Sequence, residues 1–381
     1  MTISCSFSQT DSIIAPLDAT IDRFRTLLAE RFDWCKHFMG QNSARLRSSW
    51  RDTTALIREV CTISGSATII DDARVSLAGA GVLDAVRSHD DTVLIEWLME
   101  VLSYQGVSDA IADGYMEQHG RIKTADIADG LDRKPGCQKL NSYWQFHDCG
   151  YRKTDRSCRE PRLFRRCPLP RHNLRNGRLN QTAYSLFLFC RDVAEGDLVA
   201  WIDRRLAEAD ISAAGRNCRL AAAIIDPLTH IYGVSHKVLT MSISELLLAG
   251  DPDRERWQTA GGAMIAVDTL VHNWLHRTGI LKKLDASHLY GPHCYAPNGC
   301  ADIIRKASRR IDVRRFNLEF PRNFPRFVQH AVWQFCSQSG LDQCNGNRIN
   351  DRDRCDLKDC ALYRRCRRVV LHRPRAQIPP S

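Results

Sequence analysis

The sequence predicts a mostly α-helical protein. Apolar residues recur at helical spacing along most of the chain, whereas the polar–apolar alternation typical of strands is scarce. The 381 residues, 44% hydrophobic and 26% charged, suffice for a sizeable core and have the composition of a soluble globular protein. Helical stripes are expected within the ranges 14–32, 93–102, 107–116, 183–201, 220–225, 238–248, 263–280 and 327–335.

Charge and cysteine content narrow the choice of partner and compartment. The formal net charge of +10 suits a polyanionic partner, because each Lys or Arg that meets a phosphate releases counterions. The first residues lack a secretory signal pattern, and no run of about 18 apolar residues occurs, so we expect no membrane span and a reducing, cytoplasmic location. In such a compartment, 16 cysteines favour metal or cluster ligation over disulfides.

Two shifts in composition suggest the domain organisation. The stretch 134–178 is rich in Arg, Cys and Pro, and residues 151–178 hold ten Lys or Arg against two acids. A similar Arg- and Cys-rich stretch begins near Cys344. We therefore expect a helical N-terminal extension (1–90), a core (91–335) with the basic insert (134–178), a cysteine loop (336–372) and a disordered tail (373–381).

The stretch Ile231-Tyr-Gly-Val-Ser-His-Lys237 precedes an apolar helix. A short Gly-containing turn between two helices directs backbone N–H groups outward at the start of the second helix, where they and the helix dipole can hold a phosphate. Gly233, Ser235 and His236 are therefore candidate DNA-binding residues. A plain helix-turn-helix packing unit is the alternative for this stretch taken alone.

Asp268 follows Ile265-Ala-Val and precedes an apolar helix, so we expect it at a helix N-terminus, where simple N-capping is the alternative to a catalytic role. The stretch Ile265-Ala-Val-Asp-Thr-Leu-Val, with Arg277-Thr after it, resembles the catalytic stretch of the endonuclease III family of helix-hairpin-helix DNA glycosylases. Gly233-Val-Ser-His-Lys237 resembles the family's hairpin, which usually reads Gly-Val-Gly-x-Lys. Residues 98–109 resemble its early helix and the turn containing Gln105.

This resemblance implies a two-lobed helical glycosylase fold with a cysteine-rich, metal-bound loop near the C-terminus. The family's minimal domain does not account for the residues before about 90, expected as an N-terminal helical extension, or for the basic insert with its own cysteine loop. The resemblance implies a monomeric, nucleoid-associated base-excision enzyme that flips a damaged or modified base out of double-stranded DNA and removes it. Ser235 departs from the hairpin pattern. The 31 positions from Lys237 to Asp268 exceed the family's usual spacing, which predicts an insertion near 249–259 that loops out. A non-catalytic DNA- or RNA-binding protein and a redox-sensing cluster protein are the alternatives.

The candidate residues fit the chemistry of glycosidic cleavage. Breaking the N-glycosidic bond builds positive charge on the sugar, which a carboxylate such as Asp268 stabilises. A desolvated lysine, here Lys237, can attack the anomeric carbon and form a Schiff base, which gives AP lyase activity by β-elimination; a phosphate contact is the alternative. The resemblance suggests that Gln105 fills the gap left by the flipped base. His272 and His276 lack a third ligand nearby, so we expect surface or DNA-facing positions for them.

Two sets of four cysteines are candidate metal ligands. Cys344, Cys355, Cys360 and Cys366 have the spacing C-x10-C-x4-C-x5-C, and the resemblance implies a [4Fe–4S] cluster there, with zinc as the alternative. The second set is Cys137, Cys149, Cys158 and Cys167. We expect it to hold an iron–sulfur cluster or a zinc ion, and His147 could replace one of its ligands. Both sets end in Leu-x-Arg-Arg-Cys. His293, Cys294 and Cys300 are too few for a site, so a structured loop is expected there.

Overall fold

The computed structural model describes residues 47–371 except 108, 134–135, 148, 153–156, 159–166, 172–174 and 176. The chain divides after Ala55, and all the features discussed below lie in the second unit, Leu56–Ser381. The helix expected at 14–32 and the tail at 373–381 lie outside the described residues.

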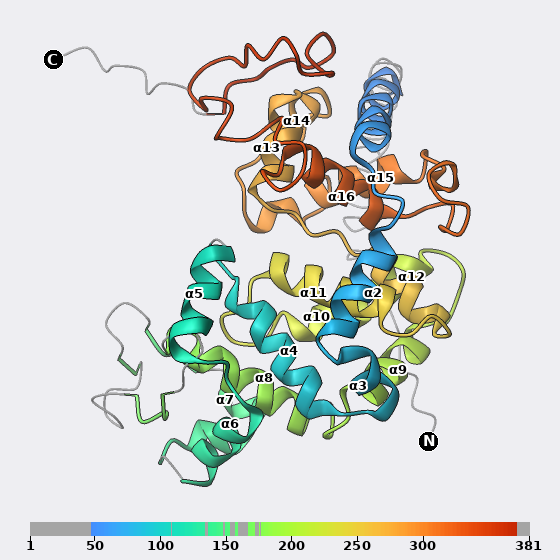
Figure 1. Cartoon of the computed structure of the whole chain (residues 1–381). Coiled ribbons are helices and arrows are strands. Elements are labelled where there is room, and N and C mark those ends of the chain that lie inside the picture. Colours follow the sequence, from blue (N-terminus) through green and yellow to red (C-terminus); the bar gives the residue numbers. More distant parts are fainter. Residues whose placement is uncertain are drawn as a thin grey trace, which may run out of the picture. The chain divides into compact units, whose positions relative to one another are not determined.

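The described part of the chain is all-α, as predicted (Figure 1). Its one β pairing is an isolated bridge between Arg152 and Ser157. After a helical stretch at 47–64, the α-helices are α2 (Ile69–Gly79), α3 (Val82–Ser88), α4 (Asp91–Ser103), α5 (Asp109–His119), α6 (Thr124–Asp132), α7 (Tyr143–Phe146), α8 (Asn180–Asp192), α9 (Leu198–Ala209), α10 (Arg216–Leu228), α11 (His236–Ala249), α12 (Glu255–Ala263), α13 (Thr269–Arg277), α14 (Ile280–Lys283), α15 (Cys300–Ser308) and α16 (Pro325–Cys336). None of the helices in these residues has the length and apolar character needed to cross a bilayer.

Two of the expected helices are divided in the structure. The stripe at 183–201 is two helices, because Glu195 and Gly196 both take positive φ (59° and 77°) and end the helical path between α8 and α9. The stripe at 263–280 is also broken: the chain leaves α12 after Ala263, runs extended and re-enters a helix at Thr269. Apolar periodicity continued across both breaks, which is why it did not reveal them.

The helices α2–α4 and α6–α12 share one hydrophobic core, with α11 at its centre. Helix α11 packs against α2, α4, α10 and α12, and ten of its 14 residues are buried. Leu77, Val82 and Val86, which belong to the segment expected as an N-terminal extension, pack into this same core. The central position of α11 makes it a rigid support for the residues at its N-terminus.

The residues between Lys237 and Asp268 do not form the loop expected near 249–259. A short turn after α11 leads directly into α12, which packs against α10 and α11. The buried Trp257 anchors this helix and donates an indole N–H to Asp203 Oδ1 at 2.6 Å. The prediction was wrong because the polar run Gly250-Asp-Pro-Asp-Arg-Glu255 supplies only a turn and the first residue of a helix.

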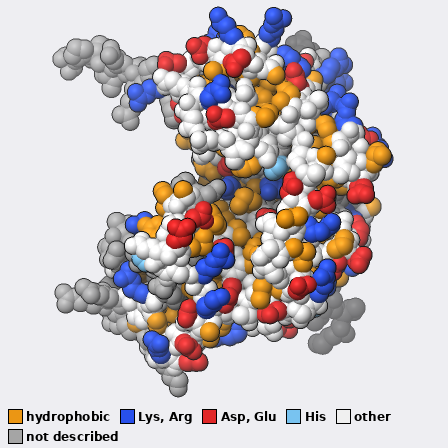
Figure 2. Space-filling view, in the orientation of Figure 1, with side chains coloured by type: hydrophobic (Ala, Val, Ile, Leu, Met, Phe, Trp, Pro, Cys, Tyr) orange, Lys and Arg blue, Asp and Glu red, His pale blue; other side chains and the backbone are white. Residues whose placement is uncertain are grey.

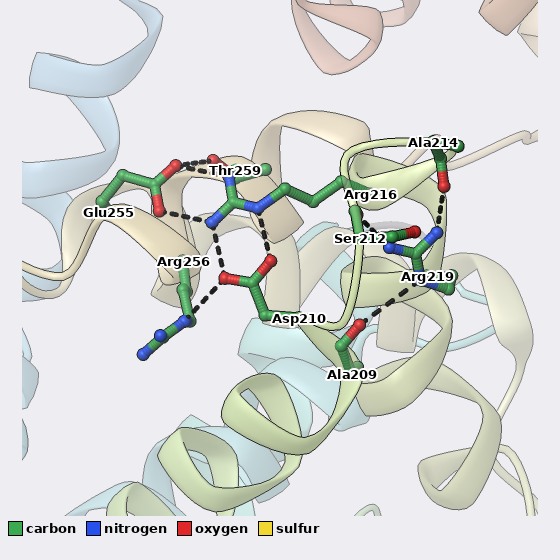
Figure 3. Close-up of polar contacts among 9 residues, drawn as sticks. All are labelled: Ala209, Asp210, Ser212, Ala214, Arg216, Arg219, Glu255, Arg256 and Thr259. Atoms are coloured by element: carbon green, nitrogen blue, oxygen red, sulfur yellow. Dashed lines mark hydrogen bonds and ion pairs between the residues drawn. The ribbon is translucent and has the colours of Figure 1, made fainter.

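Ion pairs fasten the start of α12 to the connection between α9 and α10 (Figure 3). Arg216 forms two hydrogen bonds with Asp210, at 2.6 and 2.9 Å, and two with Glu255, both at 2.7 Å. Arg256 also contacts Asp210, at 2.9 Å. Such two-pronged guanidinium–carboxylate contacts fix geometry better than single ones, so α12 is an ordered part of the core.

Replacing Trp257 with Phe should lower the free energy of unfolding by about 1–2 kcal/mol, because the hydrogen bond to Asp203 and part of the buried ring are lost. Urea unfolding followed by circular dichroism measures the change. The matched control is Trp144→Phe, since Trp144 is 64% exposed. Equal stability of the two variants would contradict the role given to α12.

A second group of helices contains α13, α15 and α16, which pack against one another, and α16 also contacts α12. The helical residues 56–64 join this group: Ser64 Oγ donates to the Ala331 carbonyl at 2.7 Å, and Arg58 donates to the Arg310 carbonyl at 3.2 Å. Glu59 forms an ion pair with Arg365. The beginning and the end of the unit therefore meet around α16.

Candidate functional site

Asp268 lies at the N-terminus of α13, as predicted. Its carboxylate accepts a hydrogen bond from the Val271 N–H at 2.9 Å, which makes it the N-cap of the helix. Burial raises the pKa of Asp268, while the Val271 hydrogen bond and the charge of Lys237 oppose the rise. A carboxylate held in a poorly solvated position near a cation is typical of functional sites.

Lys237 is the second residue of α11, which begins two residues earlier than the expected helix, and its ammonium acts electrostatically on Asp268. A second cation, Arg326 of α16, interacts with Asp268 and with Glu245. Burial lowers the pKa of Arg326 to about 10 against the opposing effect of these carboxylates. Asp268 thus lies in a site that has a second carboxylate, Glu245, together with two cations and two helix N-termini, which carry partial positive charge.

The predicted hairpin connects α10 to α11. Gly233 has a φ of +72°, and a Cβ there would lie 2.9 Å from Thr182 Oγ1, so this position requires glycine. Ser235 has ordinary extended backbone angles and accepts a hydrogen bond from the Val238 N–H at 3.3 Å. The departure from the family pattern at Ser235 therefore introduces no backbone strain and gives α11 an N-cap.

Gln105 holds the hairpin closed. Its side-chain amide donates to the Gly233 carbonyl at 2.6 Å and accepts from the Ser235 N–H at 2.6 Å. The structure thus brings together two segments that sequence alone connected only by resemblance. The Ser235 N–H, one of the donors expected to face a phosphate, is therefore already hydrogen-bonded to Gln105. Insertion of Gln105 into DNA stays a prediction, and it requires both hydrogen bonds to break.

His236, the first residue of α11, contacts Tyr295 and Thr240. Its ring lies over Tyr295, with 3.8 Å between centroids, and its Nδ1 lies 3.0 Å from Thr240 Oγ1. Both side chains line a pocket together with Asp226, Met264, Ile265 and Arg305. Burial lowers the pKa of His236. The expected DNA contact of His236 stays a prediction, and the pocket beside it is bounded by Met264 and Ile265, which lie four and three residues before Asp268.

Removing the Gln105 amide should loosen the hairpin. In Gln105→Ala, two hydrogen bonds to the turn are lost, which corresponds to about 1–2 kcal/mol of local stability, or roughly tenfold faster opening. Hydrogen exchange of the Ser235 amide measures this directly. Gln118→Ala, at an exposed position of α5, is the control. Unchanged exchange at Ser235 would show that Gln105 does not hold the turn.

The four C-terminal cysteines come together as predicted. They line one pocket whose other walls are largely apolar, formed by Trp274, Phe335, Ile349 and Leu362. The Arg368 N–H donates to Cys366 Sγ at 3.4 Å, and the Arg277 guanidinium lies 3.9 Å from Cys344 Sγ. An apolar enclosure with donors aimed at sulfur suits thiolate ligands of an iron–sulfur cluster, so these residues fit that group. Cys336 contacts Cys344 from the adjoining helix end.

The cysteines of the insert also converge. Cys137, Cys149, Cys158 and Cys167 line a common pocket, and their thiols interact electrostatically. His147, the expected substitute ligand, packs its ring against His230, with centroids 5.4 Å apart. In the first of the two Leu-x-Arg-Arg-Cys motifs, residues 163–166 lie outside the described part of the chain.

The structure reveals a further group of metal-binding character that the sequence reasoning missed. The ligand atoms of His272, His288, Cys294 and Cys300 all lie within 4.8 Å of one another, so this group could hold a metal ion. The surface position predicted for His272 was wrong, because its side chain is only 4% exposed. The signal that could have revealed the site is the even spacing His288-x5-Cys-x5-Cys.

Helix α13 connects these features. Asp268 caps its start, His272 follows one turn later, and the buried Arg277 at its end forms an ion pair with the half-buried Asp351 of the C-terminal cysteine loop. Figure 2 shows a hollow in the second unit, between α5 and the end of the unit that holds α13 and α14 (compare Figure 1). The arrangement places the Asp268 carboxylate, nearby cations and cysteine-rich loops around a single helix.

Comparison with known proteins returns no match: the chain matches no family model, no curated protein and no solved structure.

Proposed function

We propose that this chain is a DNA glycosylase of base excision, of the endonuclease III-like helix-hairpin-helix kind, with an associated AP lyase activity. The observation that carries the proposal is that Lys237 lies near enough to Asp268 for its charge to lower the pKa of that carboxyl. These residues are 31 positions apart, with a complete helix between them, yet each stands at the N-terminus of its own helix and their charges interact. A lysine and a carboxylate at one site are the groups that the two-step chemistry needs.

Base removal relies on Asp268. As the bond between base and sugar breaks, its electron pair leaves with the base and positive charge develops on the sugar. The Asp268 carboxylate stabilises that charge, and it does so more strongly in a poorly solvated site than in water. The Val271 N–H holds the carboxylate in place throughout. The base must leave the helical stack before it reaches this site.

Strand cleavage relies on Lys237. The neutral amine attacks the anomeric carbon, and a carbon–nitrogen bond forms as the bond to the base breaks. The nitrogen then gives up its first proton, and its second proton passes to the ring oxygen as the sugar ring opens to the Schiff base. The Schiff base acidifies the neighbouring carbon, and loss of a proton there expels the 3′ phosphate by β-elimination. Asp268, whose pKa is lowered by the charge of Lys237, is our candidate for accepting the first proton.

Binding to DNA draws on the hairpin and on basic side chains. The N-termini of α11 and α13 favour anions, and Gly233 lets the backbone approach closely. The exposed arginines of the C-terminal cysteine loop include Arg352, Arg354, Arg364 and Arg367. A complex built on such contacts weakens steeply with salt, which a titration of affinity against ionic strength would show.

Cys344, Cys355, Cys360 and Cys366 would hold the [4Fe–4S] cluster that the resemblance implies, with zinc as the alternative. The group would supply a covalent tie between the Arg-rich loop and the pocket beside the end of α13. Arg277 supports that tie from the protein side, through its contacts with Cys344 and Asp351. The insert's four cysteines would hold a second cluster or a zinc ion in the same manner.

A panel of duplexes, each with a single damaged, mismatched or modified base, tests the proposal under single-turnover conditions with excess protein. Release of at least one free base, and a borohydride-stabilised protein–DNA adduct, are the expected results. Tight binding without base release from any duplex would instead favour a non-catalytic nucleic-acid-binding protein. The contact between Gln105 and the Ser235 N–H favours this second function, because it occupies a donor that the enzyme would direct at DNA.

A further inference from the structure

Four side chains of metal-binding type meet one turn along α13 from Asp268. His272 Nδ1 lies 3.3 Å from Cys300 Sγ and 3.5 Å from Cys294 Sγ. His288 Nε2 lies 3.3 Å from Cys300 Sγ. His272, Cys294 and Cys300 are buried, and His288 is half-buried.

Hydrogen bonding alone explains this convergence poorly. A neutral imidazole has one N–H, and thiols are weak donors and acceptors, yet His272 Nδ1 faces two sulfurs and Cys300 Sγ faces two imidazoles. A shared ion satisfies all four atoms at once. In tetrahedral zinc sites, bond lengths of about 2.3 Å to sulfur and 2.0–2.1 Å to nitrogen place neighbouring N and S ligands about 3.5 Å apart. The observed separations of 3.3–3.5 Å agree with that geometry.

We propose that His272, His288, Cys294 and Cys300 bind one zinc ion. Two thiolates and two imidazoles are ligands that zinc prefers, whereas magnesium and calcium prefer oxygen. Four protein ligands complete a tetrahedral shell without an open position for water or substrate. The ion is therefore structural, and it is separate from both four-cysteine sets.

The zinc ion attaches the connection between α14 and α15 to α13. That connection carries Tyr295, whose hydroxyl accepts from the Val267 N–H at 3.0 Å and donates to the Val267 carbonyl at 3.2 Å. Val267 immediately precedes Asp268, so Tyr295 is a positioning residue for the carboxylate. Leu289 and Tyr290, which follow His288, are 86% and 46% exposed. Partial burial raises the pKa of Tyr290, and the negative charge of Asp268 raises it further.

Zinc content decides the proposal. Wild-type protein should carry one zinc ion per chain more than Cys300→Ser or His288→Ala, measured by mass spectrometry of the full-length protein. Metal held by the two four-cysteine sets is common to all samples and cancels in the difference. Cys218→Ser and His276→Ala, which alter a cysteine and a histidine outside the group, are the matched controls and should keep the wild-type content. Cobalt(II) substitution should show thiolate-to-metal absorption that the ligand variants lack.

Protease sensitivity supplies a second readout that does not depend on catalysis. Chymotrypsin should cut at Leu289 and Tyr290 about tenfold faster in His288→Ala than in wild type, because the exposed loop loses its anchor. His288 is half-buried, so this variant should fold even if Cys300→Ser does not. Equal zinc content and equal cleavage rates in wild type and His288→Ala would overturn the proposal. That outcome would leave the glycosylase proposal standing, since neither readout involves DNA.

Discussion

Asp268→Asn should lower the rate of base release by about 100- to 1,000-fold, the loss typical when one electrostatic stabiliser of a transition state is removed. Asparagine is as good an N-cap as aspartate, so α13 and the hydrogen bond from Val271 should persist. DNA affinity should stay within a few-fold of wild type. Single-turnover base release on the best duplex of the panel, with affinity measured separately, gives both numbers.

The same substitution should stabilise the free protein at neutral pH. Burial raises the folded-state pKa of Asp268 above its ordinary value, so the folded protein holds this proton more tightly, and stability falls as pH rises through that window. Asparagine removes the buried charge, and we expect a gain of about 1 kcal/mol, as for other functional residues that are unfavourable for stability. Asp90→Asn is the matched control, because Asp90 caps α4. A rate of base release equal to wild type in Asp268→Asn would refute the catalytic role.

Lys237→Gln should abolish the borohydride-trapped adduct, because no amine remains to form the Schiff base. Strand nicking by β-elimination should disappear with it, while slow base release through Asp268 persists. Lys282→Gln, at an exposed position of α14, is the control and should trap like wild type. If Lys237→Gln gave the adduct in wild-type yield, another residue would be the nucleophile, and Lys237 would be a phosphate contact.

The pH profile of base release separates the charge of Lys237 from its chemistry. The Lys237 ammonium lowers the pKa of Asp268, so its loss in Lys237→Gln raises that pKa further. Base release needs the carboxylate, and its acid limb should therefore move to higher pH. Lys237→Arg keeps the charge, so its limb should stay near that of wild type although the adduct is lost. Identical limbs in both variants would show that the two residues do not interact in the folded protein.

Sequence reasoning located the features that depend on local patterns. The all-α class followed from apolar periodicity, and the cap at Asp268 followed from an aspartate just before an apolar helix. Both four-cysteine sets follow from chemistry and spacing, and each set lines a single pocket. Ser235 shows why a mismatch to a family pattern needs structural inspection, since the residue that interrupts the glycine pattern caps α11.

The features that sequence reasoning missed depend on contacts between segments that are distant in the sequence. His288 and His272 are brought together by the turn after α14, which no single helical stripe encodes. The polar residues after α11 predict a loop. The structure instead anchors this segment through Trp257, whose indole N–H donates to Asp203, 54 residues away in the sequence, and the local sequence does not indicate that contact. The residues joined by the hydrogen bonds from Gln105 to Gly233 and Ser235 are 128 and 130 positions apart in the sequence. Side-chain hydrogen bonds of this kind leave no periodic trace in a sequence.

The meeting of residues 56–64 with α16 affects how the protein forms during synthesis. The core of α2–α4 and α6–α12 draws on residues 77–264, so it can assemble while the ribosome is still producing the remainder. The contacts of Arg58, Ser64 and Glu59 span 252, 267 and 306 residues, and they await the last part of the chain. We therefore expect a stalled nascent chain to hold a folded core while residues 56–64 still lack their partners around α16.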